Sequence, residues 1–188
     1  MKKAFALVAV AGVAAAASAQ SINIDVADAT LAPGESTTVT LTAGFDSADF
    51  AVAGIATNFI SSVGSDGWSD IALVAPMDGP GTSAGAGSAT GVDGVLAGQL
   101  NFPPAGIYAD SSNPIAFWSA TYTASAEGVI DLSTDTSRFD VYIDMMSSTS
   151  ESRLGDLTEG AATITVVPAP ASLALLGLGG LAAARRRR

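Results

Sequence analysis

Residues 21–45, SINIDVADATLAPGESTTVTLTAGF, contain two runs in which apolar and polar side chains alternate. Successive side chains of a β-strand point to opposite faces, so an alternation with period two predicts a strand with one buried face. The residues expected to share the buried faces are Ile22, Ile24, Val26, Thr37, Val39, Leu41 and Ala43. Pro33 and Gly34 lie between the runs and favour a tight turn. The stretch therefore predicts two strands joined by a reversal.

Further segments of strand composition follow along the chain. They are residues 50–60, 70–74, 94–102, 113–125, 128–133, 137–144 and 161–167. The alternation is clearest in RFDVYID, residues 138–144, and no long stretch between the two ends of the chain has a convincing helical period. Eight or nine short strands without helices predict an all-β fold, an antiparallel β-sandwich of jelly-roll or immunoglobulin-like type.

Residues 76–91, PMDGPGTSAGAGSATG, interrupt this pattern. Gly, Ser and Ala dominate the segment and bury little apolar surface, so it is expected to be a long mobile loop. The strand-like segments on either side are too few to fold separately. Residues 20–165 are therefore predicted to be one domain with one core.

The charge is distributed unevenly along the chain. Six of the eight Lys and Arg residues lie in residues 1–19 and 185–188, so residues 20–165 contain two cations, all eighteen acidic residues and a formal net charge of −16. Such a surface repels nucleic-acid phosphates and anionic lipids. The chain also has no Cys and no His, which excludes disulfides, thiol nucleophiles, imidazole bases and the usual zinc sites.

Residues 1–19, MKKAFALVAVAGVAAAASA, have the composition of a signal peptide, with two lysines followed by an apolar run. Ala17 and Ala19 supply the small residues that signal peptidase needs, so we expect cleavage before Gln20 after export through the Sec pathway. The alternative is an uncleaved N-terminal anchor. The apolar run is, however, shorter than the ~20 residues of a spanning helix.

At the other end, residues 170–184 carry no charge and are followed by four arginines. Pro170 suits the first position of a helix, and fifteen helical residues rise about 22 Å. Arginine side chains that reach toward lipid headgroups would extend the span toward the ~30 Å hydrocarbon core. The segment is predicted to be a transmembrane helix with its arginines on the cytoplasmic side, because clustered Lys and Arg resist translocation.

A Val-Pro-x-Pro signature, an apolar helix and an Arg cluster in this order closely resemble the PEP-CTERM sorting signal of Gram-negative bacteria. The residues that carry the resemblance within residues 166–188 are Val167, Pro168, Ala169, Pro170, Arg185, Arg186, Arg187 and Arg188. The resemblance implies processing by an exosortase, a membrane enzyme, and transfer to the cell surface or the exterior. Ala169 stands where the signature most often has Glu. An ordinary anchor that no enzyme cleaves is the alternative.

The central region resembles cohesin and related carbohydrate-binding-module sandwiches. These folds open with a strand, a Pro-Gly-Glu or Pro-Gly-Asp turn and a Thr/Val strand, as in residues 22–42, and later carry an aromatic strand like IAFWSATYTAS, residues 115–125. The likeness spans most of the domain but has no sharp motif. It implies a sandwich fold more than it implies a function.

Three aromatic residues are candidates for ligand binding. Trp68 lies among turn residues, and Trp118 and Tyr122 share one face of a predicted strand. Exposed rings of this kind stack on sugars, so they are possible ligand-binding residues. Packing in the core is the alternative for each of them, since large aromatic side chains are mostly buried.

Acidic loops are candidates for calcium binding, because hard cations take several oxygen ligands. The pairs are Asp46 with Asp49 and Asp66 with Asp70. Neither segment matches a known calcium motif, and solvated acidic loops are the alternative. No other cofactor is expected.

Together these features predict an exported β-sandwich of the cell surface or extracellular matrix, with a structural or adhesive role and no catalysis. The alternative is a carbohydrate-binding module that acts on extracellular polysaccharide. A glycosidase that uses two carboxylates is a third possibility, although nothing in the sequence selects a pair.

Overall fold

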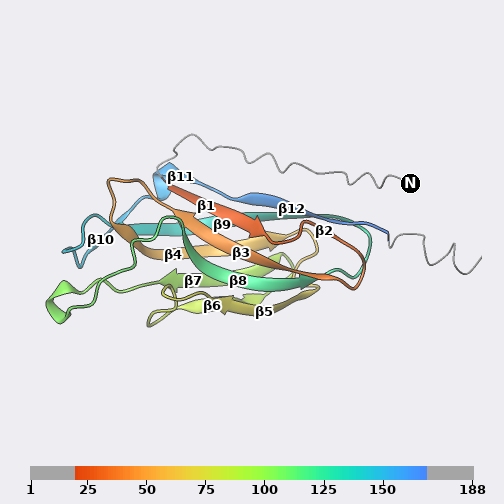
Figure 1. Cartoon of the computed structure of the whole chain (residues 1–188), viewed down its shortest axis with the longest axis horizontal. Helices are drawn as coiled ribbons and strands as arrows, with labels where there is room; N and C mark the ends of the chain where they lie inside the picture. The colour runs from red at the N-terminus through yellow and green to blue at the C-terminus, as the bar shows by residue number, and fades with distance from the viewer. Residues whose placement is uncertain (1–19, 169–188) are drawn as a thin grey trace, which may run out of the picture.

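The structure is a computed structural model and describes residues 20–168 (Figure 1). Within these residues the chain forms strands joined by loops and two short 3-10 helices. The elements are β1 (Gln20–Val26), β2 (Thr30–Leu31), β3 (Ser36–Gly44), β4 (Ala51–Ser61), β5 (Trp68–Leu73), β6 (Ser83–Gly87), β7 (Gly91–Gly98), η1 (Pro103–Ala105), β8 (Ile115–Thr123), β9 (Gly128–Tyr142), β10 (Ser150–Ser152), η2 (Leu154–Asp156), β11 (Leu157–Thr158) and β12 (Ala161–Val166).

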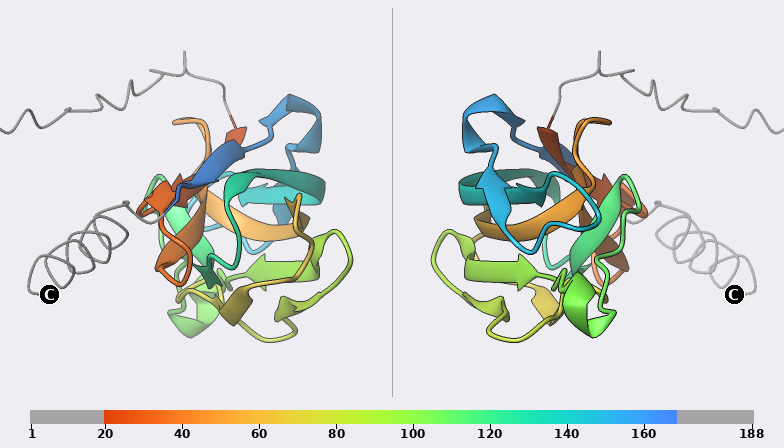
Figure 2. Two further views of the ribbon diagram at one scale, coloured as in Figure 1. Left: turned by 90° about the vertical axis from the view of Figure 1, so that its right-hand side faces the viewer. Right: turned by 90° about the vertical axis from the view of Figure 1, so that its left-hand side faces the viewer.

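Two sheets pack face to face, which confirms the predicted all-β sandwich. The first sheet has the order β11-β1-β3-β8-β5, and the second has the order β2-β12-β9-β4-β7-β6, with β10 paired to β9. Figure 2 looks along the sandwich from its two ends and shows both sheets curled around a common interior. Residues 21–26 and 39–44 pair antiparallel across the predicted reversal.

The sheets are mixed, whereas the sequence predicted antiparallel pairing throughout. β1 pairs in parallel with β11, and β12 pairs in parallel with β2. Both partners are two-residue strands inside connecting segments. A connecting segment that runs along the edge of a sheet can pair in parallel with the strand beside it. A strand of two residues is too short to show an alternation pattern in the sequence.

The interior contains the apolar faces that the alternation predicted. Val39, Leu41 and Ala43 are fully buried, and so are Phe139 and Val141 on β9. Burial of apolar surface contributes about 25 cal/mol per Å² and is the main favourable term in the stability of such a sandwich. Both sheets and this core lie within residues 20–168.

Two predicted boundaries are wrong. The two strands predicted at residues 128–133 and 137–144 are one strand, β9, which ends at Tyr142, because the residues between them continue the ladder with β4. The segment expected to be a mobile loop contains β6, which pairs with β7. Gly85 in β6 has a φ of +84°, and a Cβ there would lie 2.7 Å from the carbonyl oxygen of Asp93, so only glycine allows this close approach.

Candidate binding surface at one end of the sandwich

The three aromatic residues proposed from the sequence lie together, but inside the sandwich. Trp118 is fully buried and Tyr122 is 2% exposed, while Trp68 is partly buried against them. The ring centroids of Phe59 and Trp118 are 4.9 Å apart, and those of Trp68 and Tyr122 are 5.0 Å apart. These contacts favour core packing over an exposed stacking platform for Trp118 and Tyr122.

The two indole N–H groups are satisfied inside this cluster. Trp118 Nε1 donates to the carbonyl oxygen of Ala84 at 3.0 Å, and Trp68 Nε1 donates to Ser61 Oγ at 3.3 Å. A buried indole N–H without an acceptor would be costly. Trp118 therefore ties the glycine-rich strand β6 to the core.

Burial raises the pKa of Tyr122 above its ordinary value of 10.0. The unfolded chain then ionises at Tyr122 before the folded chain does, so the free energy of unfolding falls as the pH rises above 10. We expect Tyr122→Phe to lose less stability than the wild type between pH 8 and pH 11 in urea unfolding. Tyr108→Phe, at an exposed tyrosine, is the control and should lose as much as the wild type. Equal losses in all three proteins would contradict the prediction.

Two of the acidic side chains proposed for calcium, Asp46 and Asp49, have partners within the protein. Asp49 pairs with Arg153 instead, with 2.9 Å between Oδ1 and Nη2, and it accepts from Gln20 Nε2 at 2.8 Å. Asp46 accepts from the backbone N–H of Ala48. Among the described residues, no group of three or more potential metal-ligating side chains gathers at one place.

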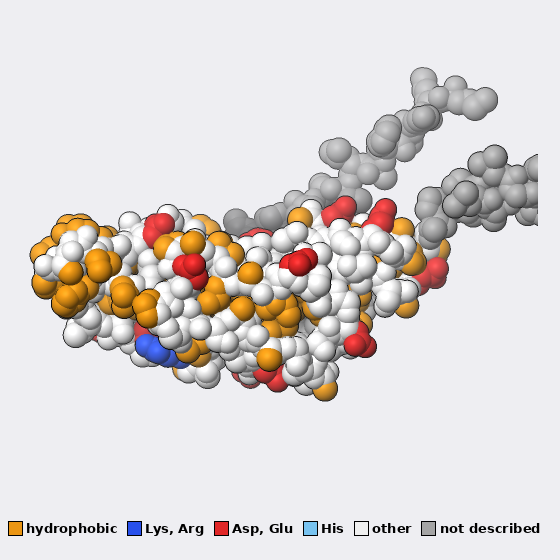
Figure 3. All heavy atoms as spheres, turned by 90° about the horizontal axis from the view of Figure 1, so that it is seen from below, with side chains coloured by type: hydrophobic (Ala, Val, Ile, Leu, Met, Phe, Trp, Pro, Cys, Tyr) orange, Lys and Arg blue, Asp and Glu red, His pale blue; other side chains and the backbone are white. Residues whose placement is uncertain are grey.

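Exposed apolar side chains gather at the end of the sandwich where β7 and β9 finish. They belong to two loops, residues 99–114 and residues 143–149. We call them the apolar tip, and its members are Leu100, Phe102, Ile107, Tyr108, Ile143, Met145 and Met146. Figure 3 shows hydrophobic side chains crowded at one extremity of the molecule. Large exposed apolar patches are uncommon on soluble proteins and mark interaction sites.

Asn101 holds the two loops together beneath this surface. The residue is 3% exposed, and its Nδ2 donates to the carbonyl oxygens of Met145 at 3.0 Å and Ser147 at 2.6 Å. Its Oδ1 accepts from the backbone N–H of Ala109 at 3.1 Å. One buried amide thus joins both loops, so the apolar side chains above it are held by a fixed backbone.

Gln99 and Tyr142 extend the network into the second sheet. Gln99 Nε2 donates to the carbonyl oxygen of Val52 at 2.8 Å, and its Oε1 accepts from the N–H of Asp110 at 2.7 Å. The Tyr142 hydroxyl donates to the carbonyl oxygen of Gln99 and accepts from the N–H of Asn101. Sequence reasoning missed this site because residues 94–102 were expected to continue as a strand. The sequence does contain a sign of a loop here, the Pro-Pro-Ala-Gly turn at residues 103–106, which lies between apolar residues.

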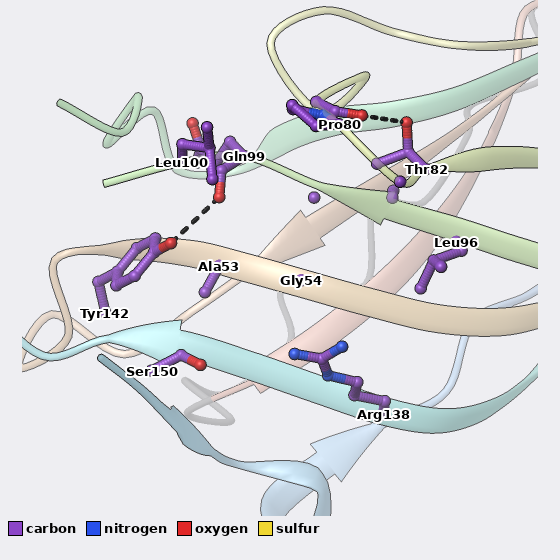
Figure 4. A pocket seen from close by; sticks show the side chains of 14 residues that line it. Ala53, Gly54, Pro80, Thr82, Leu96, Gln99, Leu100, Arg138, Tyr142 and Ser150 are labelled. Atoms are coloured by element: carbon purple, nitrogen blue, oxygen red, sulfur yellow. Dashed lines mark hydrogen bonds between the residues drawn. The ribbon is translucent and has the colours of Figure 1, made fainter. Parts of the chain in front are cut away.

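A hollow of about 220 Å³ lies beside the apolar tip on the outer face of the second sheet. Figure 4 shows Arg138 beside Gly54, with the loop that carries Pro80 and Thr82 on the other side of the hollow. Arg138 Nε donates to Asp140 Oδ2. A Cβ on Gly54 would lie 3.7 Å from the guanidinium carbon, an ordinary van der Waals contact, so Arg138 packs closely against this part of β4.

The chain leaves the sandwich at the opposite end from the apolar tip. Val166 of β12 pairs with Gly128, at the start of β9, whereas Tyr142 at the other end of β9 lies under the tip. Fourteen steps of a strand span roughly 45 Å. Residues after Val166 therefore begin far from the two loops, as Figure 1 also shows.

Sequence comparison identifies the segment that follows the sandwich. Residues 166–188 match the family described as the PEP-CTERM protein-sorting motif. The chain carries a PEP-CTERM sorting motif. This motif indicates export with sorting to the surface, and it implies processing by an exosortase. Val166 belongs both to the motif and to β12. No curated protein sequence matches the chain significantly.

Solved structures with a similar fold are cohesin modules. The cohesin module of a family 33 glycoside hydrolase from Clostridium perfringens ATCC13124 has a TM-score of 0.52 at 10% identity, over 80% of this chain and 98% of the module. The seventh ScaB type I cohesin from Pseudobacteroides cellulosolvens also has a TM-score of 0.52, at 15% identity, over 79% of this chain and 93% of the cohesin. Similarity at this level of identity establishes a cohesin-like fold.

Several predictions concern residues outside the described part of the chain. The signal peptide with its cleavage at Ala19, the transmembrane helix and the arginine cluster all lie in residues 1–19 or 169–188. Within residues 20–168, no helix is long and apolar enough to cross a membrane. The signal peptide and the transmembrane helix therefore stay predictions.

Proposed function

We propose that this chain is a surface or extracellular-matrix protein with a structural or adhesive role and no catalysis, delivered by its PEP-CTERM motif. One observation carries the proposal: the motif follows β12 at one end of the sandwich, and the apolar tip lies at the other. A sandwich held by its C-terminal segment would direct its most apolar surface away from the point of attachment. Such an arrangement suits contact with another component outside the cell.

The absence of Cys and His from the chain supports a role without catalysis, since thiol nucleophiles and imidazole bases are excluded. A carboxylate pair would be the remaining route to hydrolysis. We expect no turnover of polysaccharides by the purified protein.

Replacing all four of Arg185–Arg188 by glutamine should block normal sorting. For the wild type we expect a mature form outside the cytoplasm that lacks residues 1–19 and part of residues 166–188, measured as intact mass after cell fractionation. The variant should keep an uncleaved C-terminal segment or be mislocalised, because its segment no longer carries the clustered positive charge that resists translocation.

The control for this experiment is Arg138→Gln, which removes an exposed arginine of the sandwich and should be sorted like the wild type. Full-length, unprocessed wild-type chain in the cytosolic fraction would contradict the proposal.

Carbohydrate binding is a second candidate, favoured by the exposed rings of Phe102 and Tyr108 in the loop whose first residues, Gln99 and Leu100, line the Arg138 hollow. Sugar rings stack on exposed aromatic faces and bond to polar side chains at their edges. Affinity electrophoresis in gels that contain defined polysaccharides tests it. Retardation that Phe102→Ala and Tyr108→Ala abolish would support this candidate, and unchanged mobility of the wild type in every gel would remove it.

A further inference from the structure

We infer that the apolar tip binds a protein partner whose contact surface has an apolar centre and a rim of Lys and Arg. The inference rests on the proposed adhesive function and names the chemistry of its partner. Three properties of the described residues support it: the composition of the tip, its rigid support and the charge around it.

The composition of the tip is that of a protein interface. Met145 and Met146 are adjacent, and Met146 is 65% exposed. Methionine and aromatic side chains are enriched at protein interfaces, because methionine adapts to irregular surfaces and aromatic rings bury a large area. Most members of the tip are aliphatic or sulfur-containing, whereas a sugar platform needs flat rings side by side. The composition favours a protein over a glycan.

The support of the tip lowers the entropic cost of binding. Asn101, Gln99 and Tyr142 fix both loops through buried hydrogen bonds, and Phe102 and Ile107 pair across the turn that contains η1. A surface that is already ordered loses little conformational freedom when a partner binds. Loops built in this way present a fixed shape that a partner can match.

The charge around the tip selects among the possible occupants. Residues 99–114 and 143–149 contain Asp110 and Asp144 and no Lys or Arg. The two arginines nearby are paired, Arg138 with Asp140 and Arg153 with Asp49 and Glu151, so the charge around the tip stays negative. A surface that enters a membrane interface is usually flanked by Lys and Arg, and a second copy of this chain would bring acidic loops against acidic loops. A partner with a basic rim gains from the same carboxylates. Both alternatives are therefore disfavoured by charge.

The test uses residues 20–168, which contain both sheets and the whole core, and a defined probe. The probe is a fluorescent amphipathic helical peptide with a leucine face and lysines on its other face, and its counterpart has glutamate in place of lysine. We expect the lysine peptide to bind the wild type, measured by fluorescence anisotropy, and the glutamate peptide to bind at least about tenfold more weakly. Phe102→Ser combined with Met146→Ser should weaken lysine-peptide binding about tenfold or more, since such anchors dominate interfaces.

Two further variants separate the apolar and the electrostatic contributions to binding. Val129→Ser removes an apolar side chain that is 60% exposed at the opposite end of β9, and it should leave binding unchanged. Asp144→Asn removes a charge while its amide oxygen can still accept from the N–H of Met146, so it should weaken binding two- to threefold at low salt and less at high salt. Thermal unfolding checks that each variant is folded.

Several results would overturn the inference. If the lysine peptide bound the double variant and the wild type with equal affinity, the peptide would be adsorbing elsewhere on the acidic surface. Dimers in sedimentation that the double variant abolishes would assign the tip to a second copy. Flotation with phosphatidylcholine vesicles would assign it to lipid, and retardation in polysaccharide gels would assign it to a glycan. The binding test uses purified protein, so its failure is distinct from a failure of export, which fractionation measures.

Discussion

Trp118→Ala is expected to lower the free energy of unfolding of residues 20–168 by about 4 kcal/mol, within the range of about 3–5 kcal/mol for such truncations. The side chain is fully buried among the rings of the core. Its removal leaves a large cavity and takes away the donor to the carbonyl oxygen of Ala84. A loss of this size is a large fraction of the roughly 5–15 kcal/mol that stabilises a typical domain.

Urea unfolding followed by circular dichroism measures this change without relying on the tryptophan that is removed. Trp118→Phe is the matched variant, because it keeps most of the ring volume but loses the hydrogen bond, and it should cost about 1–2 kcal/mol. Hydrogen exchange of the β6 amides should quicken in both variants. A stable Trp118→Ala protein that has lost binding to a polysaccharide would contradict the core position of this side chain.

Asn101→Asp is expected to lower the free energy of unfolding by about 3–5 kcal/mol at pH 7, which is the second large effect. The change replaces a buried NH₂ group that donates to two carbonyl oxygens with a carboxylate oxygen that faces the same two acceptors. The backbone N–H of Ala109 keeps an acceptor, so the damage comes from the lost donors and the buried charge. Loops 99–114 and 143–149 should separate, and the apolar tip should lose its fixed shape.

The effect of Asn101→Asp should depend on pH in a stated direction. The new carboxyl group is favoured in its neutral form when folded, so its pKa is raised above the value in the unfolded chain, near 3.9. Stability of the variant relative to wild type should therefore be greatest below pH 4 and fall as the pH rises above it. Asn23→Asp, at an exposed asparagine, is the control and should change stability by less than about 0.5 kcal/mol. Equal stability of the two variants at pH 7 would contradict the role assigned to Asn101.

The aromatic strand shows where the alternation rule fails. Ile115 and Phe117 should lie on the face opposite Trp118 and Tyr122, yet all four side chains are buried. Leu41 pairs with Trp118 and Thr42 pairs with Ala116, so Phe117 is the extra residue of a β-bulge. An extra residue inverts the alternation from that point onward. Period two cannot reveal a bulge, because its position depends on the register with β3.

The candidate site was beyond sequence reasoning for a related reason. Asn101 and Gln99 are polar residues next to exposed Leu100 and Phe102, the reverse of the usual burial. An amide side chain is buried favourably only where carbonyl oxygens of other segments can accept hydrogen bonds from it. Those oxygens belong to Val52, Met145 and Ser147, which no local pattern connects with residues 99–101.

Local patterns in the sequence were enough to predict the all-β class, the buried face of β3, the acidic body without Cys or His, and the PEP-CTERM motif at residues 166–188. These properties depend on local periodicity and composition, which a linear chain displays directly. Three features became visible only in the folded chain: Trp118 and Tyr122 belong to the core, Asn101 joins two loops, and the apolar tip lies at the far end of β9 from Val166. These features depend on strand register and on hydrogen bonds between residues distant in the sequence, and both are set only when the two sheets close on each other.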